Sequence, residues 1–482
     1  MYNVIVIGGG PAGVTAALRA RELGASVALV ERSRMGGTCT NDGCVPTRVL
    51  ARAARLLRES NQFETYGLVS PLPAVDFERL MARTQQVVYT VHEKKQLISV
   101  LKDSGVTVYA GVGNAQFVDA NTIALIDGTR LEADKFILCT GGHARRLDFP
   151  GEELALTHSD IWSLKKLPRS LVIVGGAATG CQLASIFNIF GANVTIFEVS
   201  PTLLRVEDEA ISQAIHAAFE QRGIRVITGI SGVERIEKAG QNLQFHYIRD
   251  GASHVQEAEA VVLSTGWLGN VESLNLAAAG VTSERNYVPV DDYLRTSAPN
   301  IFAAGDITGR MMLVQSAGYD ARIAAENAVL GMGQHYKHHI VPHGGFTDPE
   351  YGSVGLTEQK ARAEHDYVSV IVSYSEMDRA VIDGHTEGFC KLIASRETHR
   401  LLGVHVVGEQ ALEIVHLVAA GLASDMWVEQ LAELEIAYPT YTAILGLAAR
   451  QLSRELGVLA IAPEWRALGK PYASEWERRN ID

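Results

Sequence analysis

Two stretches of the chain repeat the same order of apolar, small and acidic positions. Each has a short β-branched run, a glycine cluster, an alanine-rich segment, a further glycine and a second apolar run that ends in an acidic residue. The stretches are residues 4–31 and 171–198. This order predicts a strand, a tight turn, a helix and a second strand, which is the βαβ unit of nucleotide-binding domains. The sequence therefore indicates two such domains in one chain.

A third region begins near residue 341 and has a different pattern. Apolar runs at 389–393 and 402–407 predict strands, and segments 413–422 and 441–456 have the spacing of helices. We expect residues 151–169 to connect the two βαβ units, and the His- and Gly-rich residues 331–345 to be a linker. The pattern predicts an α/β protein with two Rossmann-like domains and a third, mixed α+β domain.

Length and charge agree with this division and limit the partners. A chain of 482 residues suggests about three domains. The net charge of −12 argues against a nucleic-acid partner. No apolar run reaches the length of about 18 residues that spans a bilayer. The N-terminus enters an apolar strand directly, so we expect no signal peptide, no membrane attachment and a cytoplasmic location.

The first glycine cluster fits a dinucleotide site. Gly8, Gly10 and Gly13 have the G-x-G-x-x-G spacing between a predicted strand and a predicted helix. They allow, in order, a tight turn, close approach of the backbone to a pyrophosphate, and packing of the helix on the strand. Glu31 closes the next strand, where a carboxylate accepts ribose hydroxyls. The alternative is a structural glycine turn without a ligand.

Two of the five cysteines lie close together. Cys39 and Cys44 are five residues apart, so a locally distorted turn and a half of helix would bring their sulfurs within bonding distance. A helix N-terminus lowers a thiol pKa and activates the pair for electron transfer. The alternative is two buried, inert thiols. Neither cysteine has a nearby histidine or a second cysteine pair, so we predict no metal site. Cys139, Cys181 and Cys390 have apolar neighbours and are expected to be buried.

Several segments together resemble a known family. Residues 36–46 read GGTCTNDGCVP, and beside the first glycine motif they are similar to the active site of the pyridine nucleotide–disulfide oxidoreductases, the family of dihydrolipoamide dehydrogenase, glutathione reductase and mercuric reductase. Residues 296–306 (TSAPNIFAAGD) resemble the second FAD motif of that family. Residues 346–358 (FTDPEYGSVGLTE) resemble the start of its dimerisation domain. The resemblance covers nearly the whole chain.

The resemblance implies cofactors, roles and domain limits. FAD would bind residues 1–150 and 270–335, NAD(H) would bind 151–269, and 340–482 would form the interface of a homodimer. Cys39 and Cys44 would form a redox disulfide, with Cys44 against the flavin and Cys39 attacking a small-molecule acceptor. Asp306 would bind the ribityl chain, with Met312 and Leu313 along the flavin. Further residues expected at the cofactors are Gly37, Thr38, Thr140, Gly141 and Gly266.

The chain departs from the family at both nucleotide sites. The second motif has Gly175, Ala177 and Gly180, with a methyl group where the middle glycine belongs. Glu198 closes the following strand and favours the free ribose of NADH over the phosphorylated ribose of NADPH. Near the flavin, Arg48 and Gln182 stand where the family has a Lys–Glu ion pair. Arginine keeps the charge and glutamine cannot pair with it, so the electrostatics there must differ.

The largest departure is at the C-terminal motif. Where the family has a histidine, and a glutamate five residues later, this chain has Tyr438 and Ala443. Tyrosine is a poor base at neutral pH. With tyrosine at this position, the chain resembles mercuric reductases and soluble transhydrogenases. However, it lacks the C-terminal cysteine pair of the mercuric reductases, and it has the redox cysteine pair that the transhydrogenases usually lack.

We therefore predict an FAD-dependent NAD(P)H oxidoreductase that passes electrons through Cys39 and Cys44 to a small disulfide, persulfide or thiol-bound acceptor. The alternatives are a mercuric or other metal-ion reductase, a flavin transhydrogenase or diaphorase with a secondary disulfide, and a non-catalytic flavin redox sensor. The linker histidines are expected to be solvated and not metal ligands, and two others to be satisfied core histidines. The linker set is His335, His338, His339 and His343, and the core pair is His405 and His416.

Overall fold

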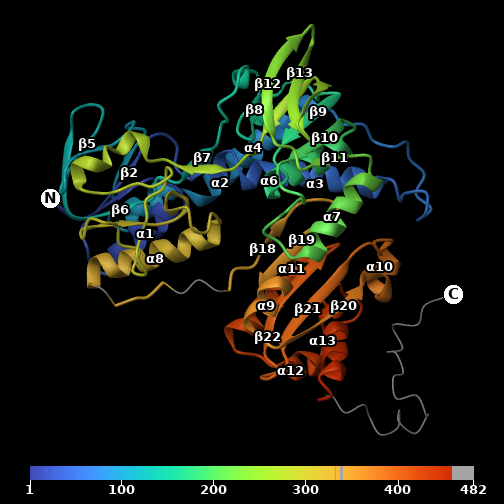
Figure 1. The fold of residues 1–482 in the computed structure, drawn as a ribbon. Helices are drawn as coiled ribbons and strands as arrows, with labels where there is room; N and C mark the ends of the chain where they lie inside the picture. The colour runs from blue at the N-terminus through green and yellow to red at the C-terminus, as the bar shows by residue number, and fades with distance from the viewer. Residues whose placement is uncertain (332, 337–339, 459–482) are drawn as a thin grey trace.

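The computed structural model describes residues 1–331, 333–336 and 340–458, which form three lobes (Figure 1). The predicted fold class is confirmed: two lobes are Rossmann-like and the third is α+β. His338 and His339 of the predicted linker, and the C-terminal tail, lie outside the described residues. Within the described part of the chain, no helix combines the length and the apolar character needed to cross a membrane.

The first lobe is built on a sheet with the order β3-β2-β1-β6-β5-β4, and β17 pairs with β6. The strands β1, β2, β3, β6 and β17 run parallel, and β1 and β2 are nearly continuous apolar runs because both of their faces are covered. The strands are β1 (Tyr2–Ile7), β2 (Val27–Glu31), β3 (Thr107–Ala110), β4 (Gln116–Asp119), β5 (Thr122–Ala124), β6 (Arg130–Leu138) and β17 (Ile301–Ala303). The helices are α1 (Pro11–Glu22), α2 (Gly37–Asn41), α3 (Cys44–Ser60), α4 (Phe77–Lys95), α5 (Leu97–Asp103) and α8 (Val314–Leu330).

The second lobe repeats the design around the sheet β11-β10-β9-β15-β8, with a three-stranded antiparallel sheet above it. Its strands are β8 (Leu156–Thr157), β9 (Ser170–Val174), β10 (Asn193–Glu198), β11 (Arg225–Thr228), β12 (Gly232–Ala239), β13 (Asn242–Arg249), β14 (Ala252–Ala258) and β15 (Ala260–Leu263). Its helices are α6 (Ala178–Ile189) and α7 (Glu209–Gln221). Both predicted βαβ units are therefore confirmed. A two-stranded ribbon of β7 (Gly142–Ala144) and β16 (Trp267–Gly269) joins the lobes.

The third lobe has the antiparallel sheet β18-β19-β22-β21-β20, covered by helices. The strands are β18 (His343–Gly345), β19 (Tyr351–Gly355), β20 (Tyr367–Ser373), β21 (Phe389–Ser395) and β22 (Leu401–Val407). The helices are α9 (Glu358–Glu364), α10 (Asp378–Asp383), α11 (Ala411–Ala423), α12 (Val428–Glu433) and α13 (Ala443–Glu455). The predicted strands and helices of this region are confirmed, with shifts of one to two residues at their ends.

Three details of the sequence prediction are wrong. Residues 151–169 are more than a connection, because β8 pairs with β15 in the sheet of the second lobe. The linker ends before residue 345, since β18 belongs to the third sheet and His343 pairs with Glu207 at 3.3 Å. His405 is a buried histidine as expected, but His416 lies exposed on α11. A helix in contact with a sheet turns only one of its faces inward, and His416 is on the other.

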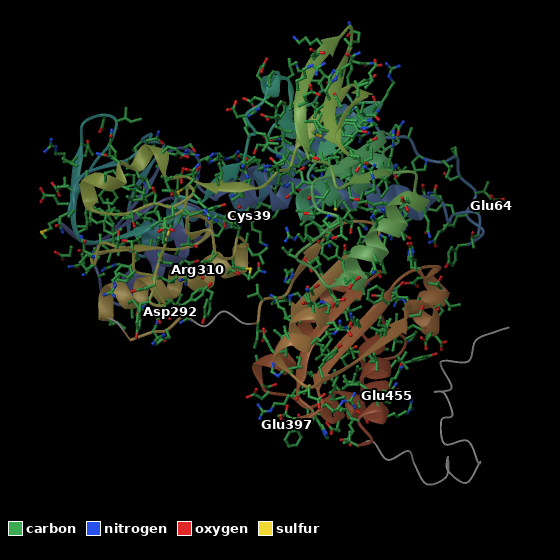
Figure 2. All side chains as sticks on the ribbon, viewed as in Figure 1. Cys39, Glu64, Asp292, Arg310, Glu397 and Glu455 are labelled. Carbon is green, nitrogen blue, oxygen red and sulfur yellow. The ribbon has the colours of Figure 1, made fainter. Side chains whose placement is uncertain are left out.

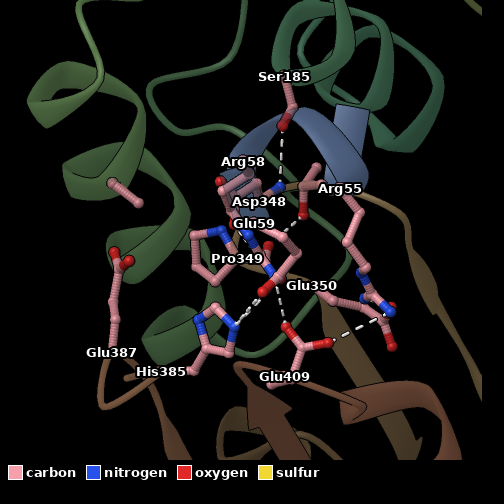
Figure 3. A network of polar contacts seen from close by, with 12 residues as sticks. Arg55, Arg58, Glu59, Ser185, Asp348, Pro349, Glu350, His385, Glu387 and Glu409 are labelled. Carbon is pink, nitrogen blue, oxygen red and sulfur yellow. Dashed lines mark hydrogen bonds and ion pairs between the residues drawn. The ribbon is translucent and has the colours of Figure 1, made fainter. Parts of the chain in front are cut away.

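Buried ion pairs hold the third lobe against the other two. Arg58 near the end of α3 binds Asp348 at 2.6 Å and Glu409 at 2.8 Å, and Arg55 binds Glu350 at 3.0 Å (Figure 3). On the side of the second lobe, the ammonium group of Lys391 is buried between Asp208 at 2.8 Å and Glu358 at 2.5 Å. Such pairs fix the geometry of an interface because each charge needs its partner.

The Lys391→Met variant tests the contribution of this second contact. Removing the ammonium group leaves Asp208 buried without its main cationic partner, so we expect a loss of about 3–5 kcal/mol in the free energy of unfolding. The measurement is the midpoint of thermal or urea unfolding. Lys238→Met, at an exposed position on β12, is the matched control and should change the midpoint little. Equal midpoints for the two variants would refute a stabilising role for the buried pair.

Candidate redox and nucleotide sites

The two cysteines lie on either side of a break between two helices. Cys39 lies within α2, and Cys44 is the first residue of α3. Between them, Asp42 has a φ of −145° and Gly43 a ψ of −107°, so the backbone leaves the helical region. The predicted distorted turn is therefore two helices with a sharp joint, and we call residues 39–44 the redox turn. Cys39 lies between the first and second lobes (Figure 2).

The two thiols are free and interact with each other. The hydrogen bond from the Cys39 thiol to the Cys44 sulfur lowers the pKa of Cys44 to about 7, although burial opposes this change. The same hydrogen bond, together with burial, raises the pKa of Cys39. Cys44 also has the N-terminus of the 17-residue helix α3 behind it. The arrangement favours a thiolate at Cys44 and a proton on Cys39.

Helix α4 holds the redox turn from one side. The imidazole Nε2 of His92 lies 2.6 Å from the side-chain oxygen of Asn41, and the ammonium group of Lys95 donates to the hydroxyl of Thr40 at 3.0 Å. Thr40 is completely buried beside Cys39. The sequence analysis did not identify these residues, since about fifty positions separate α4 from the redox turn. The only signal in the sequence was the basic last turn of α4.

A second segment holds the redox turn from the opposite lobe. Ser159 donates to the carboxylate of Asp42 at 2.7 Å, and the indole N–H of Trp162 donates to the Asp42 carbonyl at 2.8 Å. Both residues come from the stretch 151–169 that the sequence predicted only as a connection. Because both groups of Asp42 are bound, this segment fixes the joint between α2 and α3.

The predicted ribityl ligand, Asp306, lies close enough to the redox turn that its charge opposes the fall of the Cys44 pKa and adds to the rise of the Cys39 pKa. Burial raises the pKa of Asp306 itself, and the indole N–H of Trp267 donates to its carboxylate at 3.1 Å. The ring of Trp267 lies 5.1 Å from that of His158, a residue next to Ser159. Met312 and Leu313 precede α8 after the same motif. The structure thus brings the second FAD motif and the cysteine pair together.

The first glycine motif forms a cradle that fits a dinucleotide. Gly8 has a φ of +113° and ends β1, and a methyl group on Gly13 would lie 1.7 Å from the Gly8 carbonyl oxygen, so neither position accepts another residue. Gly10 caps α1 and turns the free N–H groups of this helix outward. Glu31 accepts the N–H groups of Gly9 and Ser33 at 2.6 and 2.8 Å, and one of its oxygens also accepts the Ser33 hydroxyl at 3.3 Å, so the protein fixes the orientation of this carboxylate.

The space beside this cradle is a cavity. Its lining includes the first motif, the end of β2 and the segments where the chain crosses between lobes: Gly8, Glu31, Gly113, Thr140 and Asn270. Thr140 donates through its hydroxyl to the Asn270 carbonyl at 2.9 Å, and Gly141 accepts from the Asn270 amide at 3.0 Å. Gly37 begins α2 directly opposite Gly10, and Thr38 follows it. These residues fit FAD: the free N–H groups at the start of α1 would hold its phosphates, and Glu31 would bind its ribose.

The second motif repeats the geometry of the first. Glu198 accepts N–H groups from Gly176 and Ser200 at 2.6 and 2.7 Å, as Glu31 does in the first lobe. Ala177 has φ −82° and ψ −176°, nearly the values of Gly10 at −76° and −175°. This extended conformation suits any residue, so the methyl group of Ala177 does not alter the turn. Gly175 lies in the turn after β9 and Gly180 in α6, and the two are so close that a side chain on Gly180 would collide with the Gly175 carbonyl. Gly266 directly precedes β16, one strand of the ribbon that joins the two lobes.

Arg48 and Gln182 both contact Phe346, which directly follows β18. The guanidinium group of Arg48 stacks 4.2 Å from the centre of the Phe346 ring and lies 3.7 Å from Glu350. The side-chain oxygen of Gln182 accepts the N–H of Phe346 at 3.2 Å. Arg48 thus shares Glu350 with Arg55 and has no carboxylate partner at position 182.

Tyr438 has its hydrogen-bond partner in the third lobe and not in the redox turn of its own chain. It is exposed in the loop between α12 and α13. Its hydroxyl donates to Asp378, the first residue of α10. The neighbouring Tyr441 donates to Asp383 of the same helix at 3.0 Å. A carboxylate partner therefore exists for Tyr438, but it comes from α10 and not from position 443. The sequence spacing gave no sign of it.

The described residues contain one group that resembles a metal site. Potential ligand atoms of Glu59, His385 and Glu409 lie within 4.8 Å of one another. However, Arg58 binds both carboxylates, at 2.7 and 2.8 Å, and Arg55 binds Glu409 at 3.2 Å (Figure 3). Two guanidinium groups already neutralise these acids, so we assign no metal to this group.

Asp320 on α8 is a buried acid beside the second FAD motif. One carboxylate oxygen accepts the N–H of Gly305 at 3.3 Å, and the other has no partner among the described residues. Burial raises the pKa of Asp320 to about 6. The unfolded chain ionises this carboxyl near pH 4, so between about pH 4 and 6 ionisation favours unfolding.

The Asp320→Asn variant should therefore gain stability mainly at high pH. Above pH 6 the cost of ionising Asp320 reaches about 3 kcal/mol, whereas at pH 4 it is absent. We expect the midpoint of thermal unfolding of the variant, relative to the natural chain, to be higher at pH 8 than at pH 5. Asp292→Asn, at an exposed position, serves as the control. A difference independent of pH would contradict this assignment.

Two family models match the chain. Residues 2–321 match the model described as pyridine nucleotide-disulphide oxidoreductase, and residues 341–449 match its dimerisation domain. A mercuric reductase of Lysinibacillus sphaericus is 32% identical over 463 residues, which are 95% of this chain and 84% of that protein. A dihydrolipoyl dehydrogenase of Bacillus subtilis (strain 168) is 30% identical over 467 residues, with 93% and 97% covered.

A solved structure has a similar fold throughout. The HOCl-induced flavoprotein disulfide reductase RclA from Escherichia coli aligns with a TM-score of 0.83 and 28% identity, and the alignment covers 93% of this chain and 99% of RclA. A Cu(II) complex of the same protein aligns equally well, with a TM-score of 0.83.

Proposed function

The chain belongs to the pyridine nucleotide-disulphide oxidoreductase family, as its motifs predicted, and we propose that it reduces a small disulfide-type acceptor through Cys39 and Cys44. Members of this family are FAD-dependent enzymes that use NAD(P)H, and the dimerisation domain supports a homodimer. The observation that carries the proposal is the redox turn, where Cys39 and Cys44 meet at the joint of α2 and α3, and α2 begins against the first nucleotide cradle at Gly10.

FAD, when bound, supplies a centre that accepts hydride from the nicotinamide nucleotide and passes an electron pair to the cysteine disulfide. The residues of the chain prepare the acceptor of that pair. Cys44, at the start of α3 and near Asp306, is proposed as the sulfur that faces the flavin. Cys39 is proposed as the thiol that attacks the acceptor. Its proton lies in the hydrogen bond to Cys44, and Cys39 becomes a nucleophilic thiolate when this proton is transferred.

NADH is the proposed nucleotide. Glu198 lies at the position of the ribose acid, and its oxygens are oriented by two backbone N–H groups. A carboxylate there accepts ribose hydroxyls and repels the phosphate of NADPH. The unchanged turn at Ala177 supports binding at this site and removes one reason for the alternative of a non-catalytic sensor.

A second candidate function is the reduction of a thiol-bound metal ion by the same cysteine pair. It is favoured by the mercuric reductases among the relatives and by Tyr438 in place of histidine. A structure of RclA was solved with Cu(II), which adds to the case. This chain has no cysteine after Cys390, which is buried, so a metal would have to reach the redox turn without a C-terminal pair. Metal-dependent oxidation of NADH in excess thiol would select this function.

Anaerobic titration of the purified yellow protein tests the electron path. NADH should bleach the flavin at an at least tenfold lower concentration than NADPH. The natural chain should consume one more equivalent of NADH per chain than Cys39→Ser or Cys44→Ser, because its disulfide takes two electrons. The long-wavelength band of a thiolate beside the flavin should appear in the natural chain and in Cys39→Ser, but not in Cys44→Ser. Full turnover of the acceptor by Cys39→Ser would refute the scheme.

The Tyr438–Asp378 contact provides a test of the homodimer arrangement. We propose that Tyr438 reaches the redox turn of the partner subunit and, with its hydroxyl oriented by Asp378, binds the acceptor there. Tyr438→Phe and Asp378→Asn should each lower turnover of the acceptor about tenfold, the value of one or two hydrogen bonds, with unchanged reduction of the flavin by NADH. Tyr441→Phe, which removes a hydroxyl bound to the same helix, is the control. An equal loss in this control would show that only the fold of α10 matters.

A further inference from the structure

Lys95 occupies a defined position beside the redox turn. It is the last residue of α4, and its ammonium group is held by the buried hydroxyl of Thr40, the residue next to Cys39. The rest of its side chain is exposed. The position of the charge is therefore fixed by the protein, although the group can still meet a molecule from solution.

Two charged groups act on both thiols from the elements around them. The hydrogen bond between the thiols and their burial act most strongly on the two pKa values. Lys95 on α4 opposes the rise of the Cys39 pKa and adds to the fall of the Cys44 pKa, whereas Asp306, from the second FAD motif, acts in the opposite direction on both. Arg34 adds a second cation beside α4, because Gly36, two residues further on, packs against the ring of His92, where a methyl group on Gly36 would lie 3.1 Å from Cε1. It lies close enough to His92 that Arg34 and Lys95, after burial, lower the pKa of that histidine. Arg34 is exposed, and its side chain has no partner among the described residues.

We propose that Lys95 and Arg34 form a cationic rim on the acceptor side of Cys39, and that this rim selects acceptors with a negative charge near the reacting sulfur. Disulfides that carry carboxylates beside the sulfur are the substrate class that fits this rim. The inference rests on the proposed function, in which Cys39 attacks the acceptor.

The chemistry shows what the rim contributes. The Cys39 proton first passes to the Cys44 sulfur, its hydrogen-bond partner. The Cys39 thiolate then attacks one sulfur of the acceptor disulfide, the sulfur–sulfur bond of the acceptor breaks, and its second sulfur leaves with the electron pair as a thiolate. Cys44 releases the proton to solvent and attacks the Cys39 sulfur, the first acceptor sulfur leaves as a second thiolate, and the Cys39–Cys44 disulfide forms again. Each leaving group is an anion beside a fixed cation. Lys95 thus stabilises by charge what the histidine of other family members stabilises by proton transfer.

Alkylation of the reduced flavoprotein tests the rim without any acceptor. Iodoacetate and iodoacetamide both react with the minor thiolate form of Cys39, so the thiolate fraction cancels in the ratio of their rates, and only iodoacetate carries a negative charge. We expect the ratio of their rates at Cys39, followed by mass spectrometry of the Cys39 peptide, to fall about three- to fivefold in Lys95→Met. Lys95→Arg should keep the ratio, and so should Lys94→Met, which removes an exposed charge from the neighbouring position. Raising the salt concentration should lower the ratio in the natural chain and leave it unchanged in Lys95→Met.

A rate ratio that is the same in the natural chain and in Lys95→Met overturns the proposal, whatever happens to the two absolute rates. A loss of the same size in Lys94→Met overturns it too, since the effect would then come from general surface charge. Neither result depends on NADH. A chain that shows the charge selectivity but reduces no disulfide would refute the proposed function and leave the cationic rim in place.

Discussion

The arrangement of the molecule depends on one helix, α3, which is anchored at both ends. Its first residue is Cys44, and its last turns place Arg55 and Arg58 among the acids of the third lobe. The same cluster reaches the second lobe, because the carboxylate of Asp348 also binds Arg222, which follows α7. The backbone N–H of Asp348 donates to the hydroxyl of Ser185 on α6 (Figure 3). A helix of 17 residues is about 25 Å long and stiff. The ion pairs therefore fix the redox sulfur relative to all three lobes at once.

The two nucleotide lobes show how one local design serves two ligands. Glu31 and Glu198 each accept two backbone N–H groups, and these come from equivalent positions in the two lobes. Gly10 and Ala177 have nearly the same backbone conformation. The lobes differ in what lies opposite the cradle. In the first lobe, α2 begins against Gly10, so the redox turn belongs to that cradle. The second lobe instead contributes Ser159 and Trp162, which hold Asp42 from across the interface. The redox turn is thus built by both lobes.

The local sequence pattern was sufficient to predict the βαβ units and the strands of the third lobe. These elements depend on apolar periodicity and glycine positions, which can be read from a stretch of about thirty residues. It also identified the cysteine pair and both cradles, whose motifs are contiguous. The contacts of His92, Lys95 and Ser159 with the redox turn join residues that are far apart in the chain, and no spacing encodes them. For the same reason no spacing predicted the carboxylate partner of Tyr438, which is Asp378. His416 was wrongly predicted to be buried, because its apolar sequence neighbours lie on the buried face of α11 and His416 lies on the exposed face.

The loss of the His–Glu pair changes what the site must do for a leaving thiolate. A histidine delivers a proton, so it serves acceptors whose thiols have ordinary pKa values. The groups near the cysteines here are the N-terminus of α3 and the ammonium group of Lys95, and both stabilise a negative charge without moving a proton. Asp306 opposes them, and burial raises its pKa, which limits its charge. A site of this kind works best on sulfur that leaves as an anion at neutral pH. The altered C-terminal motif and the cationic rim are then two consequences of one specialisation toward activated, negatively charged acceptors.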